Sequence, residues 1–374
     1  MTRTIVSIGG APSSGSTLLA DLLDSVPGFV CPPELYCLCF PEAYKFDDGF
    51  RQNAPGATQL FDSGCCYAAP RPWFNRKHFA MCGLDDRAFV DMTQSASTIQ
   101  DFVATLSDHI GEHLGRSVDV FCEKTPINVV TAARFCADFP TGWFVHIVRD
   151  GRSVVASLIA RGYGIYEAVL IWLQQVHLGL SAKDCENYIQ LKFEDLVQAP
   201  YDQAAQLAKK FGQSTDAQTI CEAFAANSYR ASICRPKSWS VPEFTGQIQP
   251  VTEPDAALSE TDEAFVSGLA LFEVASGETP KPVISFRQAM KACGYASPPH
   301  ADMPVSKDAF EQVFSHYLRY SKNLTRQSSL RLYPDGLRGA DEFFAYEVSG
   351  MKTAVAELER LRWKITKMTR SEGE

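Results

Sequence analysis

GAPSSGSTLL, residues 10–19, has the spacing of a phosphate-binding loop. Four residues separate Gly10 from Gly15, and Ser16 and Thr17 follow directly. Nucleotide triphosphatases place a lysine at the position of Ser16, where it reaches the outer phosphates. The absence of that lysine disfavours hydrolysis of ATP or GTP. Backbone N–H groups of such a loop, with the positive end of the following helix, can still bind a phosphate.

The residues on either side of the loop predict a strand before it and a helix after it. Residues 4–8 form a short β-branched run that leads into the glycines, which indicates a buried strand. Residues 16–25 carry leucines at helical spacing and end before Pro27. A strand, a glycine loop and a helix in this order are the context that a phosphate loop requires.

Strands and helices continue to alternate further along the chain. We expect strands at 118–123, 143–148 and 188–196, and helices at 129–138, 154–160 and 166–181. Such alternation is typical of a parallel sheet with helices on both faces. The sequence therefore predicts an α/β protein with a P-loop-like, three-layer fold, in which helices flank a central parallel sheet.

Two regions depart from this alternation. Residues 26–118 are rich in prolines, glycines and aromatic residues, which favours an insertion that builds a substrate site, with packing inside the domain as the alternative. SPPHADMP, residues 297–304, predicts a linker. We expect a domain over residues 1–297 and a helical C-terminal extension over 298–374.

Two helical patterns, at 306–322 and 341–369, lie in this extension. In the second pattern, apolar residues follow a three-four repeat from Phe344 to Ile365. Docking of this helix on its own domain is the simpler interpretation, and a homo-oligomer formed through it is the alternative.

The composition indicates an ordinary globular protein, with 45% hydrophobic and 21% charged residues. A net charge of −9 argues against nucleic acid or an anionic membrane surface as the main partner. No run approaches the ~18 apolar residues of a membrane span. The opening residues MTRTIVSIGG already predict a strand and show no secretory leader, so we expect a cytoplasmic protein.

The twelve cysteines are interpreted mostly as reduced thiols, in keeping with that compartment. Cys31, Cys37 and Cys39 lie close in sequence, but no histidine is near and their spacing matches no zinc site. His109 and His113 share a helix face without an evident third ligand. We therefore expect no metal.

Three motifs follow one another along the chain: GAPSSGSTLLADLL at 10–23, EKTP at 123–126 and VRDGRSVVAS at 148–157. They resemble the 5′-phosphosulfate loop, a lysine-bearing motif and the 3′-phosphate motif of the sulfotransferases that use 3′-phosphoadenosine 5′-phosphosulfate (PAPS). The motif style is closest to the tyrosyl-protein and bacterial members. Further landmarks in the family's order are Trp172, LKFEDL at 191–196 and MKACGY at 290–295, so the resemblance covers about residues 1–297.

The resemblance implies how the co-substrate PAPS would be bound. The 5′-phosphate would lie on the loop residues Ser13, Ser14, Gly15, Ser16 and Thr17. Arg149 and Ser157 would clamp the 3′-phosphate. In CRPKSW, residues 234–239, Lys237 is a candidate for covering the cofactor, with Arg235 beside it.

The resemblance also implies two catalytic residues. Lys124 would lie across the sulfuryl group as the cationic stabiliser. Glu34, in VCPPELY, stands about where tyrosyl-protein sulfotransferases have a catalytic glutamate, and His78 is the alternative base. His146 lies inside a predicted strand and is interpreted as a hydrogen-bonded core residue.

One position departs from the family pattern. The family commonly has a lysine or arginine just before the Ser-Gly pair, where this chain has Ser13. Either Lys124, together with Arg152 or Lys237, supplies the missing charge, or activity is weakened or lost.

The resemblance thus implies an enzyme that moves a sulfuryl group from PAPS to a hydroxyl of an alcohol or phenol and gives adenosine 3′,5′-bisphosphate. The acceptor would be a small molecule or a peptide. A P-loop small-molecule kinase and a non-catalytic PAPS- or nucleotide-binding protein are the alternatives.

Overall fold

The computed structural model describes residues 3–39, 41–45, 78–227, 248, 257–274, 280–296, 305–320 and 330–335. The chain divides into two compact units. The first comprises Met1–Arg149 and Gln175–Pro254, and the second comprises Asp150–Gln174 and Asp255–Glu374. Helix α9 (Ile165–Leu180) begins in the second unit and ends in the first.

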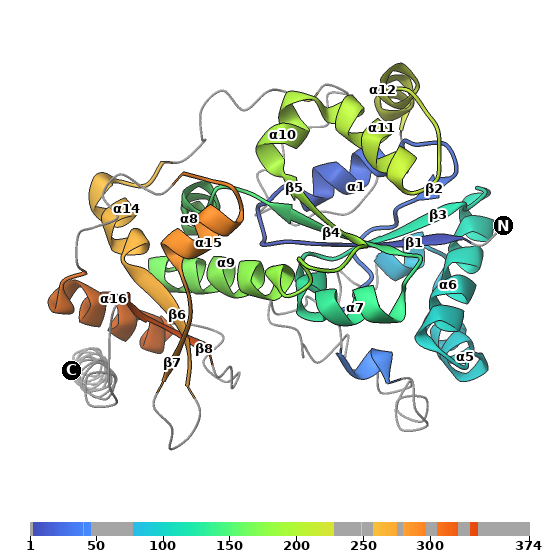
Figure 1. Ribbon diagram of the computed structural model, residues 1–374. Helices are drawn as coiled ribbons and strands as arrows, with labels where there is room; N and C mark the ends of the chain where they lie inside the picture. Colours follow the sequence, from blue (N-terminus) through green and yellow to red (C-terminus); the bar gives the residue numbers. More distant parts are fainter. Residues whose placement is uncertain are drawn as a thin grey trace, which may run out of the picture. The chain divides into compact units, whose positions relative to one another are not determined.

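A five-stranded parallel sheet forms the centre of the first unit (Figure 1). Its strands are β1 (Thr4–Gly9), β2 (Phe29–Val30), β3 (Val120–Lys124), β4 (Trp143–Val148) and β5 (Tyr188–Lys192), in the order β2-β3-β1-β4-β5. Every neighbouring pair runs parallel. The predicted parallel sheet is therefore confirmed, and β4 begins and ends at the predicted residues.

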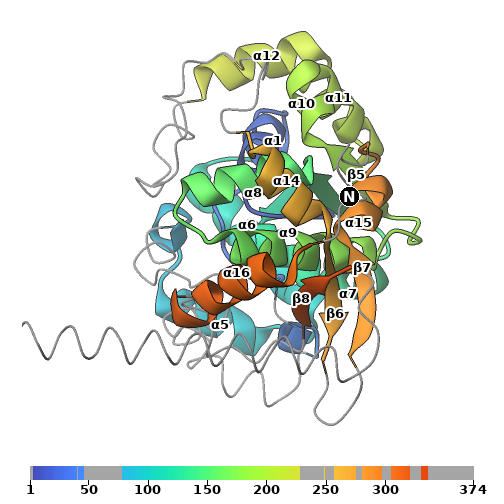
Figure 2. The ribbon, with the colours of Figure 1, turned by 90° about the vertical axis from the view of Figure 1, so that its left-hand side faces the viewer.

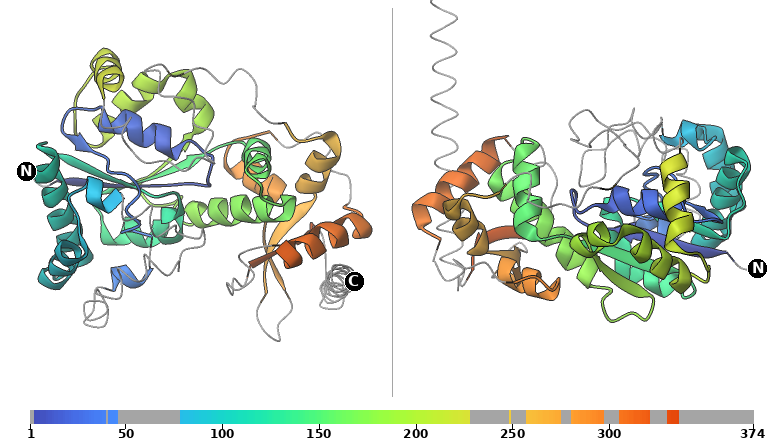
Figure 3. Two further views of the ribbon diagram at one scale, coloured as in Figure 1. Left: turned by 180° about the vertical axis from the view of Figure 1, so that it is seen from behind. Right: turned by 90° about the horizontal axis from the view of Figure 1, so that it is seen from above.

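Helices cover both faces of this sheet, as Figure 1 and the left view of Figure 3 show. One face carries α1 (Ser16–Asp24), α11 (Pro200–Lys210) and α12 (Ala217–Ala226), and the other carries α6 (Ile99–Leu114) and α7 (Ala132–Asp138). A 3₁₀ turn, η2 (Pro126–Thr131), leads into α7. The predicted three-layer α/β fold is confirmed.

The two apolar cores follow from the alternation of side chains along each strand. Ile5 packs with Phe121 and Phe144 in the cluster that includes α6 and α7. Val6 and Ile8 pack in the cluster that includes α1 and α11. Successive strand residues point to opposite faces, so β-branched residues on both sides of β1 are buried.

Strand β5 is shorter than the strand predicted at 188–196. It ends at Lys192, and α10 (Phe193–Gln198) begins at the next residue. Glu194 and Asp195 lie in the first turn of α10, where negative side chains interact favourably with the helix dipole. The prediction was wrong from Phe193 onward, because a short apolar run does not separate a strand from a helix.

Part of the region predicted as an insertion, 26–118, contributes to the core of the first unit. β2 pairs with β3 at the edge of the sheet, and η1 (Pro41–Tyr44) and α5 (Asp86–Ser95) follow. Helix α6 buries Phe102 and Leu106 in the cluster that contains Phe121. For these residues packing within the unit is observed, and a substrate-side role stays a prediction.

The second unit contains an antiparallel sheet, β7 (Lys281–Ser285), β6 (Leu269–Glu273) and β8 (Leu330–Pro334), in that order. Its helices are α8 (Gly151–Ala160), α14 (Glu260–Ser267), α15 (Phe286–Ala292) and α16 (Lys307–Tyr320). Figure 2 shows α16 beside β8 and β6, and the ring of Phe310 lies 6.2 Å from that of Tyr333. No helix among the described residues is both long and apolar enough to span a membrane.

The C-terminal part of the chain therefore contains a strand that was not predicted. Helix α16 confirms the helix predicted at 306–322, whereas β8 adds a strand to the sheet of the second unit. The predicted linker at 297–304 and the predicted helix at 341–369 lie outside the described residues. The division of the chain at residue 297 stays a prediction.

Candidate active site

The glycine loop connects β1 to α1 and is closed in by its neighbours. The Gly10 N–H donates to the Pro126 carbonyl at 2.9 Å. A Cβ atom at Gly10 would lie 2.3 Å from the Ile147 carbonyl oxygen, so a larger residue would displace the loop. Gly15 has a φ of +86°, and a Cβ atom there would lie 2.2 Å from the Phe193 ring. The two glycines of the motif are therefore required by close approach and backbone conformation.

The N-terminus of α1 presents unpaired donors to this loop. Gly15 is the N-cap, and no side chain within the described part of the chain caps the helix. The first N–H groups of a helix have no partner inside the helix, and they favour an anion. The buried Ser14 hydroxyl also has no hydrogen-bond partner among the described residues. The loop residues thus fit a bound phosphate group, and the binding roles of Ser13 to Thr17 stay predictions.

Lys124 and Glu34 meet beside the loop. The Lys124 Nζ atom lies 2.7 Å from Glu34 Oε1, and only 5% and 6% of the two side chains are exposed. The same ammonium donates to the Thr17 hydroxyl at 3.4 Å. The end of β3, the first turn of α1 and the segment after β2 therefore bring together the two side chains that were predicted to be catalytic. Their catalytic roles stay predictions.

Glu34 has two further neighbours. The Tyr36 hydroxyl donates to Glu34 Oε2 at 3.1 Å, so each carboxylate oxygen has a partner. His78, the alternative base, is buried, and its Nδ1 atom lies 3.1 Å from the Glu34 carbonyl oxygen. A carbonyl only accepts, so this contact fixes a proton on Nδ1. Both candidate bases thus belong to one cluster.

Arg149 follows β4 directly and contacts the loop. Its Nη1 atom donates to the Ser13 carbonyl at 2.9 Å. Its guanidinium carbon lies 4.5 Å from the centroid of the Phe193 ring. Ser157 lies in α8 of the second unit, so its pairing with Arg149 around a 3′-phosphate stays a prediction.

The other cations considered for the position of Ser13 differ in their surroundings. Arg152 pairs with Asp150 at 2.5 Å and with Glu263 at 3.3 Å. The hydrogen bond that Arg152 donates to Asp150 raises the pKa of Arg152, so this guanidinium is held by carboxylates. Lys237 and Arg235 lie outside the described residues.

His146 is a core residue, as its position in a strand predicted. The side chain is fully buried, and its Nδ1 atom lies 2.8 Å from the Tyr188 hydroxyl. Burial lowers the pKa of His146 to about 3, which keeps the ring neutral. Within the described ranges, nine cysteines are free thiols, and no three metal-ligating side chains gather.

Glu123, Thr125 and Asn128 were not singled out from the sequence, yet they form a hydrogen-bonded network beside Lys124 at the end of β3. The buried Glu123 carboxylate accepts from the Thr125 hydroxyl at 2.6 Å and from Asn128 Nδ2 at 2.5 Å. Burial is the main influence on the pKa of Glu123 and raises it. The signal in the sequence was the pair Glu123-Lys124 at a strand end, since adjacent strand residues must face opposite sides of the sheet.

Known proteins resemble this chain over much of its length. A protein of Caenorhabditis briggsae named "Putative protein-tyrosine sulfotransferase" is 23% identical over 211 residues, which are 53% of this chain and 62% of that protein. This chain therefore spans less than two thirds of that relative's length.

Two solved structures are also similar. The sulfotransferase domain from the Synechococcus PCC 7002 olefin synthase has a TM-score of 0.45 and 20% identity. The match covers 70% of this chain and 91% of that domain. The sulfotransferase domain from the curacin biosynthetic pathway has a TM-score of 0.45 and 17% identity. The match covers 79% of this chain and 99% of that domain. The sequence profile of the sulfotransferase family matches residues 6–217. Because this match spans more than half of the 374 residues, the chain belongs to the sulfotransferase family.

Proposed function

We propose that this protein transfers a sulfuryl group from PAPS to the hydroxyl of an alcohol or phenol. The observation that carries the proposal is the buried contact between Lys124 and Glu34 beside the phosphate loop. Membership of the sulfotransferase family supports the reaction class. PAPS, when bound, supplies the sulfuryl group.

The loop and Arg149 would hold PAPS. The N–H groups at the start of α1 and the Ser14 hydroxyl would bind the 5′-phosphate. Arg149 would bind the 3′-phosphate, with Ser157 as its proposed partner, since a guanidinium forms strong, charge-assisted hydrogen bonds with phosphate oxygens.

Glu34 would remove the acceptor's proton. As the acceptor oxygen bonds to sulfur, its proton would pass to the Glu34 carboxylate, and the bond between sulfur and the 5′-phosphate oxygen would break. The proton neutralises Glu34, so the Lys124 charge is no longer balanced by it. That charge is then available to the leaving 5′-phosphate at the moment when negative charge develops there. The stabilisation is greater in the transition state than in the ground state, which is the condition for catalysis.

Lys124 would also replace the cation that the family has at the position of Ser13. The Lys124 ammonium reaches the loop from the neighbouring strand, at 3.4 Å from the Thr17 hydroxyl. The non-catalytic alternative rests on Ser13 and on the predicted C-terminal helices. The kinase alternative is opposed by Ser16 in place of the usual lysine and by family membership.

Arg149→Ala tests the assignment of PAPS. Loss of a charge-assisted contact worth roughly 1.5–3 kcal/mol should lower the affinity for adenosine 3′,5′-bisphosphate by about tenfold or more. The affinity for adenosine 5′-phosphate, which lacks the 3′-phosphate, should fall less. Calorimetry measures both affinities, and Arg134→Ala at an exposed ion pair is the control. Equal weakening of both ligands, or preferential binding of ATP with magnesium by the wild type, would count against PAPS.

The acceptor class needs a separate measurement. Labelled PAPS incubated with a panel of alcohols, phenols and tyrosine-containing peptides should label at least one hydroxyl acceptor. Binding of adenosine 3′,5′-bisphosphate without transfer to any of them would favour the non-catalytic alternative.

A further inference from the structure

Two adjacent residues of β3 place opposite charges on opposite faces of the sheet. Lys124 lies on the face of α1, where it contacts Thr17 and Glu34. Glu123 pairs in register with Ser7 of β1, which alternates with Val6 and Ile8 on the α1 face. Because strand residues alternate, Glu123 lies on the face opposite to Lys124.

The Glu123 carboxylate is buried but has three donors. The Thr125 hydroxyl and Asn128 Nδ2 donate to it at 2.6 Å and 2.5 Å. The Leu35 N–H donates to the same oxygen as Thr125, at 3.4 Å. A buried carboxylate with hydrogen-bond donors on both oxygens forms a rigid polar network rather than a destabilising one.

Thr125 connects this network to the segment that carries Glu34. Its hydroxyl donates to Glu123 and accepts from the Tyr36 N–H at 3.2 Å. Tyr36 has a φ of +59°, a left-handed conformation that is unfavourable for a residue other than glycine. Such a backbone persists only where its surroundings hold it, and the Thr125 hydroxyl holds its amide.

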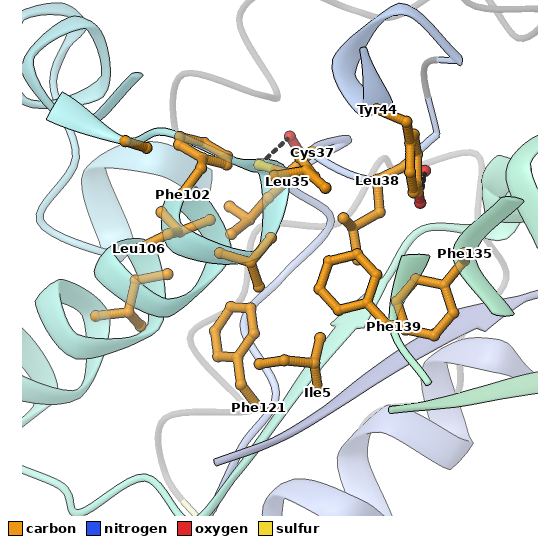
Figure 4. Packing of buried hydrophobic residues seen from close by; sticks show 14 of the residues in the cluster. Ile5, Leu35, Cys37, Leu38, Tyr44, Phe102, Leu106, Phe121, Phe135 and Phe139 are labelled. Atoms are coloured by element: carbon orange, nitrogen blue, oxygen red, sulfur yellow. Dashed lines mark hydrogen bonds between the residues drawn. The ribbon is translucent and has the colours of Figure 1, made fainter. Parts of the chain in front are cut away.

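Apolar packing also anchors the same segment. Leu35 and Leu38 are fully buried in the cluster that contains Ile5 and Phe121 (Figure 4). In the segment after β2, Leu35 is therefore buried in the core, the Tyr36 N–H bonds to the Thr125 hydroxyl, and the Glu34 carboxylate contacts Lys124.

We propose that Glu123 and Thr125 are positioning residues for the reaction, which hold the main chain of residues 34–36 so that the Glu34 carboxylate stays against Lys124. This inference rests on the proposed function, in which Glu34 is the base. Thr125 and Glu123 act through the backbone of Leu35 and Tyr36 and touch no reacting atom.

Thr125→Val is the most direct test, because valine has the shape of threonine without its hydroxyl. Hydrogen exchange at the Tyr36 amide should become faster in Thr125→Val and stay slow in Thr125→Ser, which keeps the hydroxyl. The single-turnover rate of sulfuryl transfer should fall about tenfold in Thr125→Val and recover mostly in Thr125→Ser. Affinity for adenosine 3′,5′-bisphosphate should be retained.

A double-mutant cycle with Glu34→Gln separates positioning from a general loss of structure. If Thr125 acts through Glu34, Thr125→Val should change the residual rate of Glu34→Gln by less than about twofold. Thr93→Val is the matched control, since Thr93 is a buried threonine whose hydroxyl bonds to the Phe89 carbonyl in α5. That variant should transfer at the wild-type rate.

The outcomes distinguish this inference from the proposed function. The positioning role would be overturned if Thr125→Val lowered the transfer rate tenfold in both the wild type and Glu34→Gln. It would also be overturned if hydrogen exchange at the Tyr36 amide did not change in Thr125→Val. If Thr125→Val does not fold, Glu123→Gln provides the same readouts, because its new amide opposes Asn128 Nδ2. A wild-type protein that transfers no sulfuryl group overturns the proposed function, while the exchange of Tyr36 still reports the contact.

Discussion

His146 makes the stability of the first unit sensitive to acid. Its pKa is about 3 in the folded chain, well below the ordinary value near 6.5. The unfolded chain therefore binds a proton that the folded chain excludes, and stability falls as the pH drops from about 6.5 towards 3. Between pH 6.5 and 4.5 this loss should be about 2–3 kcal/mol.

Urea unfolding at pH 6.5 and 4.5 measures this contribution. The free energy of unfolding should fall less in His146→Gln than in the wild type. His113→Gln, at an exposed histidine, should behave as the wild type does. An equal loss in wild type and His146→Gln would mean that His146 is not the group responsible.

Among single residues, those in local motifs could be predicted and those that depend on tertiary contacts could not. The loop at 10–19 could be identified from its own spacing, whereas catalytic roles for Lys124 and Glu34 were implied only by the family resemblance. The contact between Glu34 and Lys124 was not predicted, because it joins side chains 90 residues apart in the sequence. Thr125 and Tyr36 gave no signal, since the hydrogen bond from the Tyr36 N–H to the Thr125 hydroxyl joins residues 89 positions apart.

At the scale of elements, the junction of the loop, α1 and α10 explains why Gly15 is needed. Gly15→Ala would combine a left-handed backbone with a Cβ atom 2.2 Å from the Phe193 ring. We expect at least a tenfold loss of affinity for adenosine 3′,5′-bisphosphate by calorimetry, because the loop must shift.

Gly115→Ala is the matched control for Gly15→Ala. Gly115 has a φ of +63° at the end of α6, but nothing lies within 4 Å of its Cβ position. Its substitution should lower stability by about 1 kcal/mol and leave nucleotide affinity unchanged. Unchanged affinity in both variants would show that the close approach at Gly15 does not shape the site.

Long periodic elements were predictable, and short or ambiguous ones were not. β4 matches its predicted bounds and α9 differs by a residue at each end, since their apolar patterns are continuous. β5 was predicted too long, because the residues FEDL at 193–196 continue the apolar run of the strand. The acidic residues of FEDL instead favour the first turn of a helix. β8 was missed because five residues acquire strand structure only by pairing with β6.

At the scale of the whole chain, the second unit depends on residues beyond the predicted linker. β8 pairs with β6 along its length, and the Tyr166 hydroxyl bonds to the main chain of Leu332 in both directions. A chain ending at residue 297 would expose Tyr166 and one edge of β6. Its β6 amides should exchange far faster than in the full chain.

A chain ending at residue 335 is the control, because it retains α16 and β8. Its β6 amides should stay protected in hydrogen exchange measured by mass spectrometry. Equal protection in the full chain and in the chain ending at 297 would mean that β8 does not stabilise the sheet of the second unit.

Single-turnover transfer from labelled PAPS is the sharpest test of the proposed role of the buried Lys124 and Glu34 pair in sulfuryl transfer. With calorimetry confirming retained affinity for adenosine 3′,5′-bisphosphate, Lys124→Ala should lower the rate by about a hundredfold or more. Lys124→Arg should recover part of that loss, since it keeps the charge and changes its geometry. Glu34→Gln should lower the rate by about 10²–10⁴-fold. Transfer near the wild-type rate in both Lys124→Ala and Glu34→Gln would contradict the account.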